Sequence, residues 1–195
     1  MPLLPWRKLQ GDKAAEYMIK QAWARGTAES SFSLGAATGA GLREYYYGPY
    51  DTYVSLNLNY WYAQTFTPLV THTLGSAKVN VTRKETTATL TISLRAIGAG
   101  GVPTGSDLSA GTSNLAIIYP TIVWCTVTLL PAYQLQANTM YALVIRDSTD
   151  NANTWLYYDT TSPTYTRGNY CQSSNTGTDW TSDTSKCLLF AEYGA

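Results

Sequence analysis

Apolar and polar side chains alternate most regularly in Ala88-Thr89-Leu90-Thr91-Ile92-Ser93-Leu94-Arg95-Ala96, which is followed by Gly98-Ala99-Gly100-Gly101-Val102-Pro103-Thr104-Gly105. Successive side chains of a β-strand point to opposite faces, so this alternation predicts a strand with one buried face. Glycine and proline supply the backbone conformations that turns need, so the second segment predicts a turn. Together they predict one strand of an antiparallel sheet and the turn that closes it.

The same pattern recurs on both sides of this strand. Further strands are expected at Val54–Tyr60, Trp61–Phe66 (as a continuation of the preceding strand or its partner), Ala77–Val81, Asn114–Ile118, Thr121–Leu129, Leu135, Thr139–Arg146 and Leu188–Tyr193. In one of them Val123, Cys125, Val127 and Leu129 share a face. Short strands separated by turns predict an all-β fold, an antiparallel β-sandwich. No long helical period interrupts them, which argues against a parallel α/β sheet.

Composition excludes several classes of protein. The chain has 195 residues, enough for one main domain, and its 13 basic and 13 acidic residues give a net charge of +0. A nucleic-acid binder or a polybasic membrane-surface protein needs a surplus of basic residues, so neither is expected. No stretch approaches the roughly 20 apolar residues that span a bilayer. The start, Met1-Pro2-Leu3-Leu4-Pro5-Trp6-Arg7-Lys8, lacks a secretory pattern, and we expect synthesis in a cytoplasm.

Residues 1–41 differ in character from residues 42–195, and we expect an N-terminal arm followed by the β-domain. Asp12 can cap a short helix that Gly26 ends, and Gly35–Gly41 has the composition of a linker. The apolar face of that helix includes Met18, Ile19 and Trp23. The arm is either a disordered tail with a spacer or an anchor that orders when it docks. Two tryptophans, Trp6 and Trp23, favour the anchor, because leaving them in water is costly.

Cysteine and histidine are too few for a metal site. The cysteines are Cys125, Cys171 and Cys187, and His72 is the sole histidine. Cys125 is typical of a core residue, whereas Cys171 and Cys187 flank a polar loop and are either bridged across it or two separate thiols. We predict no metal and no cofactor.

The order of these features resembles a jelly-roll domain of carbohydrate-binding-module type, as found in head-decoration and tail proteins of tailed phages and in surface anchoring modules. The resembling segments are Gln64-Thr65-Phe66, Leu90–Ala96 with the turn Gly101–Leu108, Leu135–Ile145, and Tyr165–Gly168 followed by Trp180 and Leu188-Leu189-Phe190. The resemblance covers about residues 62–195 and leaves the arm outside. It implies a jelly roll and a structural role in a virion.

Enzymatic constellations are not evident. The sequence has no nucleophile elbow, and His72 is expected in a loop or at a strand edge rather than as a catalytic base. Asp147, Asp150 and Asp159 are the carboxylates that could serve glycoside hydrolysis, but acidic residues near turns are usually solvated or bonded to backbone. We predict no catalytic residue and no enzyme.

A glycan site is the better-motivated alternative, because sugar rings stack on aromatic faces and polar side chains bind their hydroxyls. The candidates are Trp155, Tyr157, Tyr158, Arg167, Asn169 and Tyr170. Strand alternation allows only half of the aromatic residues to face outward. The competing interpretation is that they fill the core or a subunit interface, as we expect for Trp180 and Tyr141.

Tyrosines gather where the arm meets the β-domain. Tyr45, Tyr46 and Tyr47 open a segment with few charges, which as a free surface would be an unusually large apolar patch. We expect them, with Trp6, Met18, Ile19 and Trp23, to form an assembly interface. The expected function is a non-enzymatic virion structural protein, assembled in the host cytoplasm and bound to copies of itself and other virion proteins. The resemblance leans toward a trimer. The alternative is a glycan-binding module for attachment to a cell surface.

Overall fold

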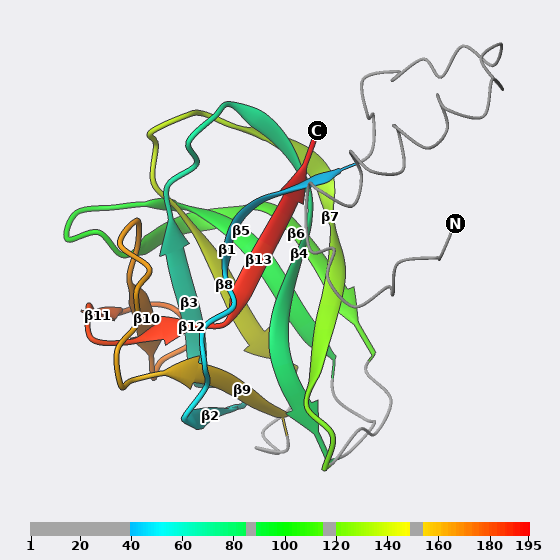
Figure 1. The fold of residues 1–195 in the computed structure, drawn as a ribbon, viewed down its shortest axis with the longest axis vertical. Helices are drawn as coiled ribbons and strands as arrows, with labels where there is room; N and C mark the ends of the chain where they lie inside the picture. Colours follow the sequence, from blue (N-terminus) through cyan, green and yellow to red (C-terminus); the bar gives the residue numbers. More distant parts are fainter. Residues whose placement is uncertain (1–39, 85–88, 115–119, 149–153) are drawn as a thin grey trace, which may run out of the picture. The chain divides into compact units, whose positions relative to one another are not determined.

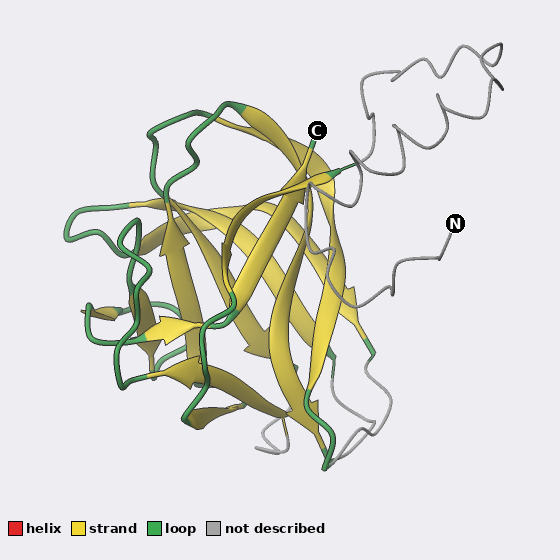
Figure 2. Cartoon of the chain, in the orientation of Figure 1, coloured by secondary structure: helices red, strands yellow, loops and turns green. Residues whose placement is uncertain are grey.

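A computed structural model describes residues 40–84, 89–114, 120–148 and 154–195. This part of the chain is all-β and antiparallel, and its thirteen strands form a curled sheet (Figures 1 and 2). It contains no helix, so none of its segments is a helix that could cross a membrane. The helix expected between Asp12 and Gly26 lies outside the described residues.

The strands are short apart from β4, β6 and β7. Their bounds are β1 (Gly41–Tyr46), β2 (Thr52–Leu56), β3 (Trp61–Phe66), β4 (His72–Arg83), β5 (Leu90–Ile97), β6 (Pro103–Ser113), β7 (Val123–Leu135), β8 (Tyr141–Asp147), β9 (Thr154–Asp159), β10 (Tyr170–Ser173), β11 (Thr181–Asp183), β12 (Cys187–Leu188) and β13 (Phe190–Gly194).

Pairing divides the sheet into two groups of strands. The first runs β1-β13-β4-β7, with β9 paired to the end of β4 and both β2 and β12 paired to β9. The second runs β6-β5-β8-β3-β10-β11. They join where Ala110 of β6 pairs with Leu130 of β7. The sheet therefore curls from one group into the other (Figure 1).

The main core lies between the inward faces of the two groups. Leu90, Ile92 and Leu94 of β5 are each 0% exposed, which confirms the strand expected from the alternation at residues 88–96. On β7, Cys125, Val127 and Leu129 are buried in the same core, as expected. The prediction of an antiparallel all-β fold is thus correct. The apolar faces of the alternating strands meet in the core, as alternation requires.

A smaller apolar cluster lies on the opposite face of the second group. It contains Ala63, Ala142, Val144 and Cys171, with Trp180 packed against it. Tyr141 belongs to the main core, as expected, but Trp180 does not. Cys187 also belongs to the main core, so Cys187 and Cys171 lie in different apolar clusters. The three cysteines are free, buried thiols. Of the two alternatives for this pair, the structure has the separate thiols.

The strand expected at Val54–Tyr60 ends early. Oδ1 of Asn57 accepts hydrogen bonds from the backbone N–H groups of Asn59 (2.9 Å) and Tyr60 (2.8 Å) and closes a turn there. Strand β2 pairs with β9, whereas β3 pairs with β8 and β10. The expectation that Trp61–Phe66 continues or pairs with the preceding strand is therefore wrong.

Other boundaries shift by a few residues. The turn expected at 98–105 is shorter, because β6 already begins at Pro103. The closing strand is divided at Leu189, which separates β12 from β13. The strand expected at Asn114–Ile118 falls almost wholly outside the described residues.

Candidate functional site

The outward face of the first group carries aromatic side chains around one lysine. Nζ of Lys78 lies 4.9 Å from the ring centre of Tyr47, 5.1 Å from that of Trp124 and 5.2 Å from that of Tyr193. The hydroxyl oxygens of Tyr47 and Tyr193 are 3.1 Å apart. An ammonium group over several ring faces is held by cation–π attraction. The face thus presents a positive charge in an aromatic setting.

These contacts shift the titration of the groups involved. Burial alone would lower the pKa of Lys78, but the Tyr193 and Tyr47 hydroxyls outweigh it and raise that pKa. Burial raises the pKa of Tyr47. Burial also acts to raise the pKa of Tyr193, yet its contacts with Lys78 and Tyr47 lower the pKa overall. Lys78 therefore stays charged at neutral pH.

A hollow of about 380 Å³ opens beside this lysine. Its lining consists of Tyr47, Gly48, Tyr50, Lys78, Asn80, Trp124 and Leu189. Asn80 is only 6% exposed, and its Oδ1 atom has no hydrogen-bond partner within the described part of the chain. Asn80 pairs with Trp124 across β4 and β7, and Lys78 lies two residues earlier on the same face of β4. The register of β4 and β7 thus brings the Asn80 amide, the Lys78 ammonium and the Trp124 indole together.

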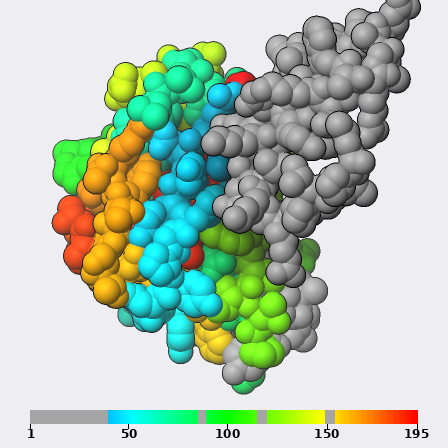
Figure 3. Space-filling view, viewed as in Figure 1, coloured from blue at the N-terminus to red at the C-terminus, as the bar shows by residue number. Residues whose placement is uncertain are grey.

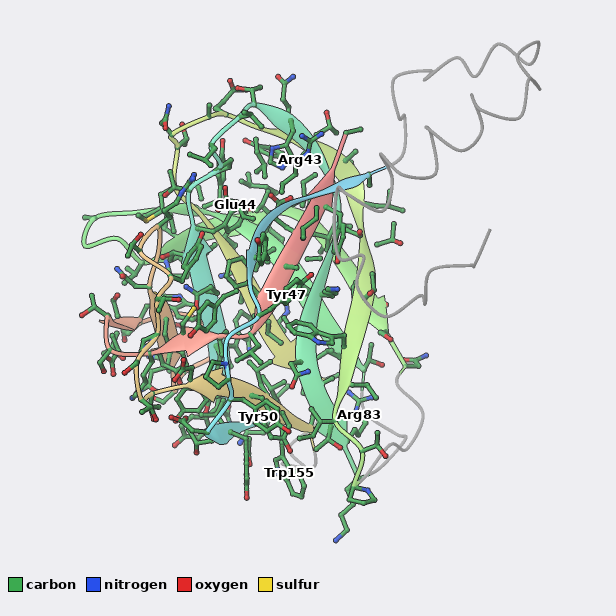
Figure 4. All side chains as sticks on the ribbon, in the orientation of Figure 1. Arg43, Glu44, Tyr47, Tyr50, Arg83 and Trp155 are labelled. Atoms are coloured by element: carbon green, nitrogen blue, oxygen red, sulfur yellow. The ribbon has the colours of Figure 1, made fainter. Side chains whose placement is uncertain are left out.

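More aromatic rings continue along this face. Tyr50 meets Tyr157 with ring centres 5.1 Å apart, and Tyr53 lies 5.2 Å from Trp155 and 5.8 Å from Tyr157. Tyr47, Tyr50 and Trp155 follow one another down the view in Figure 4. The space-filling view shows the segment from β1 to β2, in cyan, at the surface (Figure 3). We call Tyr47, Tyr50, Tyr53, Trp124, Trp155, Tyr157 and Tyr193 the aromatic face.

The glycan candidates fall in three places. Trp155 and Tyr157 belong to the aromatic face. Tyr158 and Tyr170 point the other way, where they stack with ring centres 5.4 Å apart and Tyr170 is buried in the main core. The structure therefore does not bring these four rings together, because alternation along β9 sends neighbouring residues to opposite faces.

Arg167 and Asn169 lie elsewhere, at the lining of a second hollow of about 430 Å³. The Arg167 guanidinium donates to the backbone carbonyl of Thr67 and lies 3.3 Å from Oε1 of Glu44. Asn169 is joined to Thr65 through its backbone: its N–H donates to Oγ1 of Thr65 (2.7 Å), and its carbonyl accepts the Thr65 N–H (2.9 Å). The Arg167 guanidinium and the Asn169 backbone are thus engaged within the protein.

The three tyrosines expected at an assembly interface differ in exposure. Tyr45 and Tyr47 are 50% and 42% exposed and their rings are 4.9 Å apart, whereas Tyr46 is buried. The Tyr46 hydroxyl donates to Asp159, and burial with that bond raises the pKa of Tyr46 to about 12. Trp6, Met18, Ile19 and Trp23, the other candidates for this interface, lie outside the described residues.

The candidate carboxylates are buried and bonded within the protein where the structure describes them. Asp147 is 3% exposed and pairs with the fully buried Arg83 at 3.2 Å. Asp159 is 0% exposed and accepts the Thr161 N–H at 2.9 Å as well as the Tyr46 hydroxyl. Asp150 lies outside the described residues. Within the described ranges, no three His, Cys, Asp or Glu side chains are grouped as metal ligands would be.

His72 is neither in a loop nor exposed at an edge. It begins β4, is 4% exposed, and lies 3.0 Å from the buried carboxylate of Glu192. The expected position of His72, in a loop or at a strand edge, is therefore wrong. Glu192, from the last strand, gives the imidazole a buried partner.

Lys78, Asn80 and Trp124 were not predicted from the sequence to form a binding site. The sequence signal that could have indicated them is alternation, which places them on the outward sides of their strands. Lys78 and Asn80 alternate with Ala77, Val79 and Val81, and Trp124 precedes Cys125. Comparison with known proteins finds no family model and no curated protein that matches this chain.

Proposed function

We propose that this chain is a non-enzymatic structural protein of a tailed-phage particle, either a capsid decoration or a tail component. Its β-domain is a jelly roll, and residues 1–41 anchor it to copies of itself and to other virion proteins. The arm works as a docking segment, and the β-domain presents the outer surface.

One observation carries this proposal: an exposed aromatic surface begins where the arm ends. Tyr45 on β1 and Tyr47 just after it are 50% and 42% exposed, and Tyr50 and Tyr53 nearby are 48% and 50% exposed. Exposed apolar patches mark interaction sites, and tyrosine is enriched at protein interfaces. A neighbouring subunit covering Tyr45 and Tyr47 removes that surface from water.

The jelly-roll assignment is supported by the arrangement of the strands. Two groups of antiparallel strands enclose the main core, and the first group contains pairing between strands far apart in the chain, as between β1 and β13. The segments that carried the resemblance form β3, β5 with the turn into β6, β8, and the closing strands β12 and β13. A double-sheet jelly roll has this kind of architecture.

Deletion of residues 1–41 tests the proposal. We expect the remaining chain to keep the far-ultraviolet circular dichroism of a β-protein and cooperative unfolding, while multi-angle light scattering shows that the full chain self-associates and the truncated chain does not. In a particle-assembly assay, the truncated chain should also fail to join particles. Unfolding of the truncated chain, or oligomers unchanged by the deletion, would contradict the proposed role of the arm.

Glycan binding is the second candidate, favoured by one specific observation. The aromatic face combines exposed rings with a hollow that holds a buried polar group without a partner. A purely packing interface has no need for such a group. We therefore retain surface attachment through a glycan as the alternative function.

A further inference from the structure

The hollow beside Lys78 offers three kinds of contact at once. We propose that it binds an acidic saccharide, in which one sugar ring packs on the aromatic wall, a carboxylate meets the Lys78 ammonium and a hydroxyl donates to Oδ1 of Asn80. This inference rests on the glycan-binding alternative above and gives it a site and a ligand class.

The first argument comes from Asn80. The residue is only 6% exposed, and its Oδ1 atom accepts no hydrogen bond from the residues that the structure describes. Buried polar atoms of native proteins are nearly always paired, and an exception calls for an explanation. Asn80 lines a hollow that opens to the surface, so a rotation of its amide toward the hollow lets a ligand supply the missing donor. A hydroxyl group does so, whereas an apolar ligand leaves the oxygen unpaired.

The second argument comes from Lys78. Among the described residues, no carboxylate lies within ion-pair distance of its ammonium group, whose neighbours are the rings of Tyr47, Trp124 and Tyr193. The described residues that line the hollow include no acidic side chain. A positive charge without a counter-ion at the rim of a hollow attracts an anion, and a carboxylate is the anionic group of uronic and sialic acids.

The third argument comes from the walls. Tyr47, Tyr50 and Trp124 line the same hollow, and aromatic faces carry negative potential that attracts polarised C–H groups. A pyranose ring has such C–H groups on one face and hydroxyls at its edge. Lys78 and Asn80 are two residues apart on one side of a strand, about 7 Å along it, so one substituted sugar ring can reach both.

The three features together narrow the ligand class. An apolar ligand satisfies only the walls, and a simple inorganic anion satisfies only Lys78. A neutral sugar satisfies the walls and Asn80 but leaves the ammonium without a counter-ion. An acidic saccharide satisfies all three.

The test uses the purified full chain on an array on which uronic-acid and sialic-acid glycans stand beside their uncharged parents. Isothermal titration then follows with one matched pair, sialyllactose and lactose, or a galacturonate oligomer and its galactose counterpart. We expect the acidic member to bind at least tenfold more tightly, with a difference that shrinks as salt increases. Equal binding of both members, or no binding of any acidic glycan, overturns the proposal.

Variants locate the site. Lys78→Gln should bring acidic binding to the level of the uncharged parent, and Asn80→Leu should weaken both by at least tenfold. Asn80→Leu removes an unpaired acceptor, so its melting temperature should not fall, which separates lost binding from lost folding. Where that variant proves unstable, Tyr50→Ala, at a 48% exposed residue of the same wall, serves instead.

Trp155→Ala is the matched control, because Trp155 belongs to the aromatic face but not to the lining of the hollow. It should leave affinity unchanged. Binding that survives Lys78→Gln and Asn80→Leu but is lost in Trp155→Ala overturns this site while leaving the glycan-binding alternative standing. Neither result bears on the arm, whose deletion tests the structural role separately.

Discussion

Nε2 of His72 lies 3.0 Å from Oε2 of Glu192, and the two side chains are only 2% and 0% exposed. The other oxygen of Glu192 accepts the backbone N–H of Glu44 at 3.1 Å. Glu44 in turn lies 3.3 Å from the Arg167 guanidinium and accepts the Leu69 N–H at 3.3 Å. A largely buried network of ionisable groups thus ties β1, the strand that follows the arm, to β4 and β13.

This network predicts a pH dependence with a definite sign. Burial raises the pKa of Glu192 above its usual 4.5, although His72 and the Glu44 N–H act to lower it and the Glu44 carboxylate adds to the rise. Folding therefore favours the protonated carboxyl. This contribution to stability is complete below about pH 4.5 and is lost as pH rises through the folded-state pKa. Relative to Glu192→Gln, the natural chain should lose free energy of unfolding between pH 4 and pH 7. Urea titrations across that range measure the difference, and a pH-independent difference would contradict the prediction.

Asp107 should show the opposite sign. Burial alone would raise its pKa, but Arg146 and Arg95, at 2.6 Å and 2.8 Å, outweigh burial and lower it. This contribution is present above the usual pKa of 3.8 and is lost as pH falls through the folded-state value. Asp107→Asn should therefore destabilise the protein most at neutral pH and progressively less below pH 4. Thermal melts of both proteins from pH 2 to pH 7 test this. A gap that widens on acidification would count against the two arginines as the cause.

The buried hydroxyl of Tyr46 gives a third prediction. It donates to Asp159, which is 0% exposed, so Tyr46→Phe removes a bond to a buried carboxylate. Hydrogen bonds to charged groups contribute about 1.5–3 kcal/mol, and we expect a loss of that order. Tyr45→Phe is the matched control one residue earlier, because Tyr45 is 50% exposed, and it should change stability by less than about 0.5 kcal/mol. Chemical denaturation measures both, and similar losses would show that the Asp159 bond is not the cause.

The part of the fold that was predictable is the part that depends on one-sided burial. On β5 and β7 alternation alone identifies the core residues, because a strand with one face in water must separate apolar from polar residues. Pairing between distant strands leaves no local pattern. His72 and Glu192 are 120 residues apart in the chain, and each alone is an ordinary polar residue. Their burial could not be foreseen from either neighbourhood.

The candidate site shows the same division. A tyrosine-rich surface near Tyr45 and Tyr47 was expected from composition, whereas the hollow was not. It exists because the register of β4 and β7 places Asn80 opposite Trp124, while the segment that follows β1 places the Tyr47 ring beside Lys78. The glycan candidates were chosen by nearness in sequence, and alternation along β9 sent Tyr157 and Tyr158 to opposite faces.

The approach of a loop to β3 gives a last prediction. A Cβ atom at Gly168 would lie 1.7 Å from the backbone oxygen of Thr65 and 2.9 Å from the backbone nitrogen of Phe66. No side chain can move to relieve this contact, because both atoms belong to the backbone of a strand. The loop is held there by the bonds between Thr65 and Asn169, at 2.7 Å and 2.9 Å. Gly168→Ala must push the loop away and break them.

We expect Gly168→Ala to reduce the free energy of unfolding by about 1–3 kcal/mol, the usual range for overpacking, or by more where the bonds to Asn169 are also lost. Gly75→Ala is the matched control: its added Cβ atom would meet nothing closer than the Tyr193 backbone oxygen at 3.8 Å, so its effect should stay within about 0.5 kcal/mol. Amide hydrogen exchange gives the sharper measurement, because the Thr65 N–H, which donates to the Asn169 carbonyl, should lose protection only in Gly168→Ala. Unchanged protection there would mean that the loop does not depend on this contact, since a displaced loop cannot keep that N–H covered.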